Sequence, residues 1–143
     1  MQRRHFLQRA TSALALASFP HLASCATPSG LKLGFSLYGM KTLALADALK
    51  TCAEIGYQSV EFALNAGYIT EPTAFDSTAR KEASELLAAL HLDLPCLMLN
   101  LSLTADDKAH ATNLASIAAA GQMAQELQPD HPPIIETVLG GKP

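Results

Sequence analysis

The sequence predicts an α/β protein in which parallel strands alternate with helices, and three observations support this fold class. Residues 45–56 repeat apolar side chains at helical spacing, and residues 59–64 then alternate apolar and polar side chains as a strand does. Residues 94–101 form a continuous apolar run, which is typical of a strand buried on both faces of a parallel sheet. The prolines from residue 129 onward end the last helical stretch. With 143 residues, the chain is long enough for one domain.

The predicted elements follow one another in the order βαβαβαβ, and strands joined by right-handed helical crossovers run parallel. The predicted strands are residues 31–38, 59–64, 94–101 and 134–139. The predicted helices are residues 45–56, residues 76 or 77 to about 90, and residues 104 or 106 to about 128.

The first helix and the strand after it show the clearest local pattern. Apolar residues from Leu45 to Cys52 share one helix face, and Gly56 stands where a left-handed cap ends a helix. In the strand, Val60 and Phe62 are expected to pack under helices. Glu61 then points to the opposite face, which is the interior in a closed barrel. A carboxylate there is costly unless it is paired or used.

The other two helices are predicted from their caps and apolar faces. Asp76 or Ser77 caps the second helix, and Thr104 or Asp106 starts the third. The expected buried residues of these two helices are Ala83, Leu86, Leu87, Leu90, Leu114, Ile117, Ala118, Gly121 and Leu127.

The N-terminus has the features of an export signal. Residues 1–26 begin with basic residues, continue with a short apolar run and end with small residues, and residues 27–30 read as a linker. The RRHFLQ run resembles the bacterial twin-arginine signal, with Arg3 and Arg4 as the pair. Its end fits either a lipobox with a lipid on Cys25 or an ordinary cleavage site. We therefore expect a periplasmic protein or a membrane-anchored lipoprotein, with contact to the membrane only through this segment.

Charge and cysteine content exclude several classes of function. Three of the ten basic residues lie in the first nine positions, so the rest of the chain carries seven basic against thirteen acidic residues. Such an acidic body argues against binding nucleic acid. Cys52 on a helix face and Cys96 in a strand are expected to be small core residues. No pair of cysteines or histidines has the spacing of a structural zinc site, so no metal site is expected.

Two arrangements of the sheet remain open on these patterns. One is a small doubly wound sheet with helices on both faces, and the other is a segment of a (β/α)8 barrel, which takes about 250 residues when complete. Neither GxGxxG nor GxxxxGK[ST] follows the first strand, so nucleotide binding has no support in the sequence.

Three stretches resemble the opening of the sugar phosphate isomerase/epimerase family, namely LKLGFSLYGM, LKTCAEIGYQSVEFAL and ASELLAALHLDLPCLMLNL. The recurring features are Ile55-Gly56-Tyr57 followed by Val60-Glu61, and His91-Leu92 before the third strand. The resemblance spans residues 31–139. It implies a xylose-isomerase-like TIM barrel, of which this chain would supply four strands, a partial barrel forming the N-terminal half.

The resemblance also implies what this chain would lack. Family members that use a divalent metal usually take its ligands, two Glu, an Asp and a His, from later strands, so a metal belongs to a full-length parent and no cofactor is expected here. On this interpretation the chain is a truncated product or fragment. A half barrel exposes strand edges, so we expect self-association through them.

Chemistry in such barrels sits at the carboxyl ends of the strands, which here carry Tyr38, Glu61, Asn100 and Glu136. Glu61 and Glu136 are the predicted catalytic pair, one as base and one as acid. The structural alternative for Glu61 is a carboxylate held by neighbouring strands. Tyr38 and Asn100 are predicted to bind substrate. Their alternatives are a rim aromatic for Tyr38 and a loop cap for Asn100.

Three functions follow from these expectations. The first is an isomerase or epimerase that moves a proton on a small carbohydrate through an enediolate, inactive as this chain alone. The second is a non-catalytic half-barrel that binds carbohydrate or associates with itself. The third is cleavage of DNA at abasic sites, which some relatives with the same barrel carry out. Both the acidic body and the export signal count against it.

Overall fold

The structure, a computed structural model, describes residues 30–102 and 106–138. From Lys32 onward the chain forms one compact unit. The predicted signal segment and the proposed lipidation site at Cys25 lie outside the described residues. Within those residues, no helix combines the length and apolar character needed to cross a bilayer.

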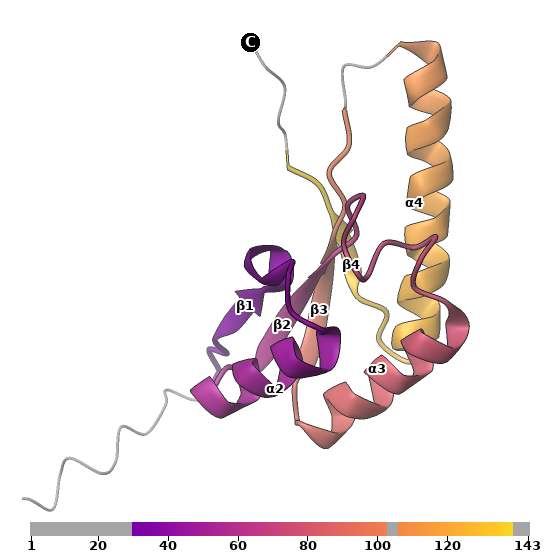
Figure 1. The fold of residues 1–143 in the computed structure, drawn as a ribbon. Helices are drawn as coiled ribbons and strands as arrows, with labels where there is room; N and C mark the ends of the chain where they lie inside the picture. The colour runs from indigo at the N-terminus through magenta and orange to yellow at the C-terminus, as the bar shows by residue number, and fades with distance from the viewer. Residues whose placement is uncertain (1–29, 103–105, 139–143) are drawn as a thin grey trace, which may run out of the picture. The chain divides into compact units, whose positions relative to one another are not determined.

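Four parallel strands alternate with helices, as predicted (Figure 1). Each strand pairs in parallel with the next in the chain, which gives an open sheet of order β1-β2-β3-β4. The strands are β1 (Gly34–Ser36), β2 (Ser59–Ala63), β3 (Asp93–Met98) and β4 (Ile134–Glu136), and the helices are the 3-10 helix η1 (Leu37–Met40), α2 (Leu45–Ile55), α3 (Ser77–Ala89) and α4 (Asp107–Leu127).

The strand order decides between the two arrangements that the sequence left open, a doubly wound sheet and a segment of a (β/α)8 barrel. A doubly wound sheet reverses its strand order at a switch point and carries helices on both faces. Here the order never reverses, and side chains of α2, α3 and α4 share one core cluster with Val60, Phe62 and Leu97 of the strands. The helices therefore cover one face of the sheet, as they do along consecutive strands of a (β/α)8 barrel.

The core forms between that face and the helices. Val60 and Phe62 of β2 are completely or almost completely buried, as are Leu49 and Cys52 of α2. This confirms the prediction that Val60 and Phe62 pack under helices and that Cys52 is a core residue. Because side chains alternate along a strand, Glu61 projects from the opposite face, which no helix of residues 30–102 and 106–138 covers.

The first strand is shorter than predicted. Only Gly34–Ser36 pairs with β2, and the chain then turns into η1, which contains Tyr38. Ser36 causes the change, because its side-chain oxygen accepts a hydrogen bond from the Tyr38 main-chain N–H and caps the 3-10 turn. The prediction that Tyr38 ends a strand was therefore wrong.

The third strand contains an irregularity that the apolar run concealed. Ser59 of β2 pairs with Asp93, but Glu61, two residues later, pairs with Cys96, three residues later. The extra residue of this bulge lies next to Pro95, which has no N–H to donate to the ladder. Leu94 and Leu97 thus both face the helices, while Cys96 is half-buried on the open side. The prediction that Cys96 is an ordinary core residue was wrong.

The helix ends were predicted more accurately than the strands. Gly56 ends α2 with φ 101°, and Asp76 and Asp106 cap α3 and α4 by accepting hydrogen bonds from main-chain N–H groups. On α4, however, the buried residues all lie in the second half, and Leu114 and Ile117 are exposed. The first turns of α4 lie beyond the carboxyl ends of the strands, where no part of the sheet covers them (Figure 1).

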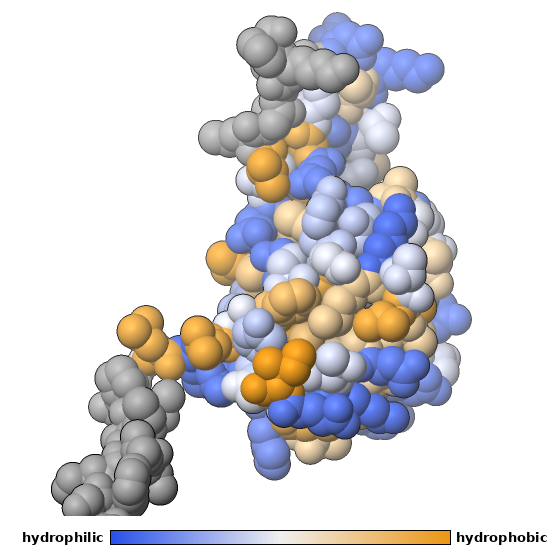
Figure 2. All heavy atoms as spheres, turned by 60° about the vertical axis from the view of Figure 1, so that its left-hand side comes forward, coloured by the Kyte–Doolittle hydropathy of each residue, from blue (hydrophilic) through white to orange (hydrophobic). Residues whose placement is uncertain are grey.

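Large apolar side chains are also exposed elsewhere on the unit. In Figure 2 orange and tan areas lie between blue and white ones on the face that is shown. Among the described residues, β1 pairs only with β2 and β4 only with β3, so the sheet has two open edges. Ile134 and Val138, at the β4 edge, are 67% and 54% exposed.

Two glycines offer a matched test of backbone conformation. At Gly56 an added Cβ would meet no atom, but its φ of +101° strains any L residue, so Gly56→Ala is expected to lower the free energy of unfolding by about 1–2 kcal/mol. At Gly121, inside α4, a Cβ also meets no atom, and Gly121→Ala is expected to raise it by about 0.5–1 kcal/mol. Urea unfolding of both variants measures the change in the free energy of unfolding. A change of the same sign in the two variants would contradict this account.

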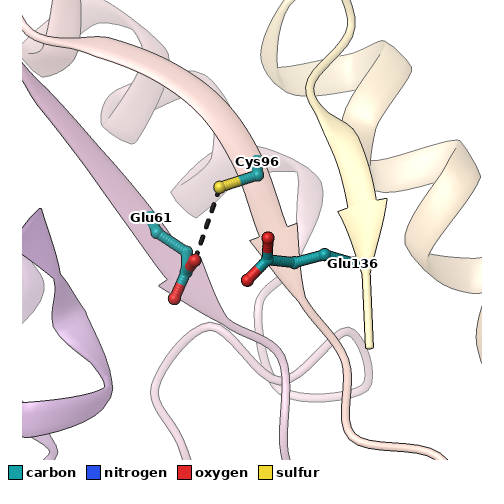
Figure 3. A group of neighbouring side chains, drawn as sticks. All are labelled: Glu61, Cys96 and Glu136. Carbon is teal, nitrogen blue, oxygen red and sulfur yellow. Dashed lines mark hydrogen bonds between the residues drawn. The ribbon is translucent and has the colours of Figure 1, made fainter. Parts of the chain in front are cut away.

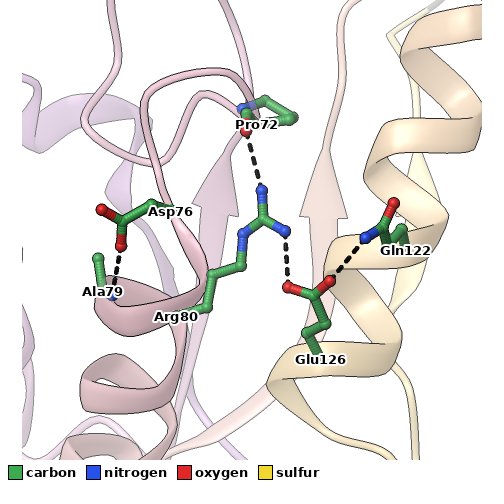
Figure 4. A network of polar contacts seen from close by, with 6 residues as sticks. All are labelled: Pro72, Asp76, Ala79, Arg80, Gln122 and Glu126. Carbon is green, nitrogen blue, oxygen red and sulfur yellow. Dashed lines mark hydrogen bonds and ion pairs between the residues drawn. The ribbon is translucent and has the colours of Figure 1, made fainter.

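Arg80 of α3 joins two segments that are distant in the sequence (Figure 4). Its Nη1 donates to Glu126 Oε2 at 2.7 Å, and its Nη2 donates to the Pro72 carbonyl oxygen at 2.8 Å. Gln122 Nε2 donates to the other Glu126 oxygen at 2.8 Å. The network fixes α3 against α4 and against the loop before α3, which lies at the carboxyl side of β2.

These bonds make the stability depend on pH in a defined direction. The hydrogen bonds from Arg80 and Gln122 lower the pKa of Glu126 below the ordinary 4.5. The bonds therefore stabilise the fold above pH 4.5, and this contribution is lost as the pH falls through the lowered pKa. We expect Glu126→Gln to lower the melting temperature at pH 7 and to have progressively less effect below pH 4.5. A difference in melting temperature between the wild type and Glu126→Gln that stays constant down to acid pH would contradict the expectation.

Candidate functional site

The uncovered face of the sheet brings together three side chains from three neighbouring strands (Figure 3). Glu61 comes from β2, Cys96 from β3 and Glu136 from β4. The register sets this meeting, because Glu61 pairs with Cys96 and Glu136 pairs with Met98, two residues after Cys96 on the same face. One metal-binding atom of each side chain lies within 4.8 Å of the other two.

Glu61 is held by donors on both sides. Ser36, its neighbour on β1, donates its hydroxyl hydrogen to Glu61 Oε1. The Cys96 thiol donates to Glu61 Oε2 at 3.4 Å. These two contacts fix the plane of the carboxylate near the centre of the face.

The two carboxyl groups are close enough to perturb each other. Hydrogen bonding to Glu61, partial burial and repulsion by Glu61 raise the pKa of Glu136. Burial, the hydrogen bond to Glu61 and the charges of both glutamates raise the pKa of the Cys96 thiol to about 12, so the thiol stays protonated at neutral pH. None of the ion pairs among the described residues includes Glu61 or Glu136.

An open cavity of about 780 Å³ lies over this part of the face, at the carboxyl ends of the strands. Its volume is within the range of small-molecule sites. Polar groups and apolar side chains both contribute to its wall. The lining residues are Ser36, Tyr38, Gly39, Glu61, Met98, Asn100, Leu101, Ser102 and Val138.

The rim of the cavity carries an aromatic pair. Tyr38 is half exposed and stacks on Tyr68, with ring centroids 5.4 Å apart and planes at 25°. Lys41 Nζ lies 4.7 Å from the centroid of the Tyr68 ring. The exposed Tyr38 ring therefore has a fixed orientation beside the cavity.

The structure brings the four predicted site residues to one end of the sheet. Glu61, Tyr38 and Asn100 line the same cavity, and a carboxylate oxygen of Glu136 lies within 4.8 Å of one of Glu61. Asn100 is exposed, and its main-chain N–H donates to Asn65 Oδ1 at 2.9 Å. In this contact the Asn65 side chain caps the loop, and Asn100 takes part through its main chain.

Sequence reasoning missed Ser36 and Cys96. Ser36 could have been found, because the strand register places it beside Glu61 and a hydroxyl can donate to a carboxylate. Cys96 could not be placed by alternation alone, since the bulge near Pro95 changes which residues face the open side.

Comparison with known proteins adds no assignment. No protein-family model matches this sequence, and no curated protein matches it.

The arrangement supports two kinds of chemistry. Two carboxyl groups in contact beside a cavity can take and give protons. Two carboxylates and a thiol that converge from three strands also form a set of donors for a metal ion.

Proposed function

We propose that the protein acts on a small carbohydrate, moving a proton between neighbouring carbon atoms through an enediolate, as an isomerase or epimerase does. The observation that carries the proposal is the meeting of Glu61 and Glu136 on the uncovered face, beside a cavity at the carboxyl ends of parallel strands. Ligands of parallel α/β sheets bind at those ends.

The reaction needs one base and one acid. One carboxylate removes the proton from the carbon next to the carbonyl group, and the electron pair of that C–H bond moves toward the carbonyl oxygen. The other carboxyl group donates a hydrogen bond or its proton to this oxygen. The isomer forms when the hydroxyl group on the first carbon gives its proton to a carboxylate and becomes the new carbonyl group, while a proton is added to the former carbonyl carbon. The epimer forms when the former carbonyl oxygen releases its proton again and the first carbon is protonated on its opposite side.

The wall of the cavity supports a polyhydroxylated substrate. The side chains of Ser36, Tyr38, Asn100 and Ser102 offer hydroxyl and amide groups that can pair with sugar hydroxyls. The resemblance of residues 31–139 to the sugar phosphate isomerase/epimerase family supports the same substrate class.

Solvent deuterium exchange tests the proposal directly. The folded chain is incubated in D₂O with pentoses, hexoses and their phosphates, and NMR follows the loss of the proton next to the carbonyl group. The family resemblance alone predicts a chain that is inactive without the later strands of the barrel. Because Glu61, Glu136 and the cavity all belong to this chain, we instead expect exchange above the buffer rate for at least one sugar. If no sugar in the panel exchanges faster than in buffer, the catalytic proposal is wrong.

The runner-up function is a carbohydrate-binding or self-associating module without catalysis. The Tyr38 ring, held against Tyr68, offers a flat apolar surface of the kind that sugar rings stack on, and the two open sheet edges can pair with a second copy. Saturable sugar binding without deuterium exchange would favour this alternative over the enzyme.

A further inference from the structure

We infer that Glu61, Cys96 and Glu136 together bind one divalent ion of intermediate softness, such as Zn²⁺. This inference adds a cofactor to the site of the proposed function, and its role there rests on that function. Its existence rests on the geometry and charge of the three side chains alone.

The distances suit one shared ion. Zinc binds carboxylate oxygen and cysteine sulfur at about 2.0–2.3 Å, so two ligand atoms on a tetrahedral ion lie about 3.5 Å apart. The three ligand atoms here lie within 4.8 Å of one another. The Cys96 sulfur and Glu61 Oε2 are already 3.4 Å apart, and Ser36 donates to the other Glu61 oxygen. Glu136 is exposed, so its side chain has room to rotate toward them.

The charges of the two carboxylates also favour a cation. Glu61 is half-buried and Glu136 is exposed, and among the described residues neither belongs to an ion pair. Binding of the ion as a thiolate complex requires the Cys96 thiol to lose its proton, which passes to solvent.

The donors select the kind of ion. A thiolate disfavours Mg²⁺ and Ca²⁺, which prefer oxygen alone, and favours zinc and its neighbours in the first transition row. Three protein ligands would leave a fourth position for water or substrate, as in catalytic rather than structural zinc sites, and one of the three, Glu61, lines the cavity. An ion there polarises a carbonyl oxygen of the substrate.

This site differs from the one that the family resemblance implies. That set comprises two Glu, an Asp and a His from later strands, whereas the present set uses a thiol and lies on β2, β3 and β4. Sequence patterns gave no indication of it, because Cys96 was expected in the core.

Titration of the full chain with Co²⁺ tests the site without any assay of turnover. Cobalt bound by a thiolate absorbs in the near ultraviolet through charge transfer from sulfur, and carboxylate ligands alone give no such band. We expect the band to appear on addition of Co²⁺ and to disappear when Zn²⁺ is added in excess. Its absence in the folded wild-type chain would overturn the inference.

Cysteine variants identify the ligand. The chain has three cysteines, so a Cys25→Ser, Cys52→Ser double variant keeps only Cys96. We expect this variant to retain the band and Cys96→Ser to lose it, with circular dichroism as the check of folding. Glu61→Gln and Glu136→Gln are each expected to weaken Co²⁺ binding by at least about 10-fold. A band that persists in Cys96→Ser would assign the metal to another cysteine and refute the site.

The outcomes also separate this inference from the proposed function. Cobalt binding at Cys96 without deuterium exchange on any sugar would keep the metal site and reject the carbohydrate reaction. Exchange in a chain that shows no Cys96-dependent band would keep the reaction and reject the metal site.

Discussion

Glu61→Gln is expected to reduce the rate of deuterium exchange on the accepted sugar by at least about 100-fold, the lower range of what a positioned acid or base contributes. Glutamine has nearly the same shape as glutamate, and its amide oxygen can still accept the hydrogen bond from Ser36. It cannot take up a proton at neutral pH. The variant therefore removes the chemistry while it keeps the surroundings of the side chain.

Replacement of glutamate by glutamine at two other positions provides the comparison with Glu61→Gln. Glu136→Gln is expected to cause a loss of similar size, because the acid and base act as a pair. Glu85→Gln is the matched control, since Glu85 lies on the exposed surface of α3, 3.9 Å from Lys81 and outside the site. NMR exchange rates, with circular dichroism of each variant, measure the effect. Full activity in Glu61→Gln would show that Glu61 is a structural carboxylate.

Local patterns were sufficient to predict Glu61 on the uncovered face. Alternation along residues 59–64 assigns Val60 and Phe62 to one side and Glu61 to the other, and the structure has them so. The helix ends were predictable for the same reason. Gly56, Asp76 and Asp106 act through hydrogen bonds within a few residues, so their effect does not depend on the rest of the fold.

Cys96 shows where alternation fails. A single extra residue in β3 transfers every later side chain to the other face, and nothing in the run LPCLMLNL marks the position of the extra residue except Pro95. Cys96, which donates to Glu61 and completes the cluster, could therefore be placed only from the register of β3 against β2.

The prediction of the buried residues of α4 was partly wrong for a different reason. Leu114 and Ile117 have the correct helical spacing, but a helix contributes to the core only where another element lies beside it. The buried residues of α4 are Ala120, Met123, Ala124 and Leu127, which belong to the half of the helix that packs against the body. Hydrophobic spacing therefore predicted Leu127 correctly but not Leu114 and Ile117, because packing depends on where the sheet ends.

Phe62→Ala is expected to have the largest effect on stability, lowering the free energy of unfolding by about 3–5 kcal/mol. Phe62 is fully buried, and its ring meets Phe75 edge-on with centroids 6.4 Å apart. The substitution removes both the apolar burial and the aromatic contact, and it leaves a cavity under the middle of β2. Domains are stable by only about 5–15 kcal/mol, so the loss is a large share of the total.

Urea unfolding, followed by circular dichroism, measures this loss. Ile55→Ala is the control, because Ile55 is 64% exposed at the end of α2 and should cost at most about 0.5 kcal/mol. A cost below about 1 kcal/mol for Phe62→Ala would contradict the described core. Since Phe62 and Glu61 are adjacent on β2 and face opposite sides, the same variant should also weaken the Cys96-dependent cobalt band, which would show that the core positions the site.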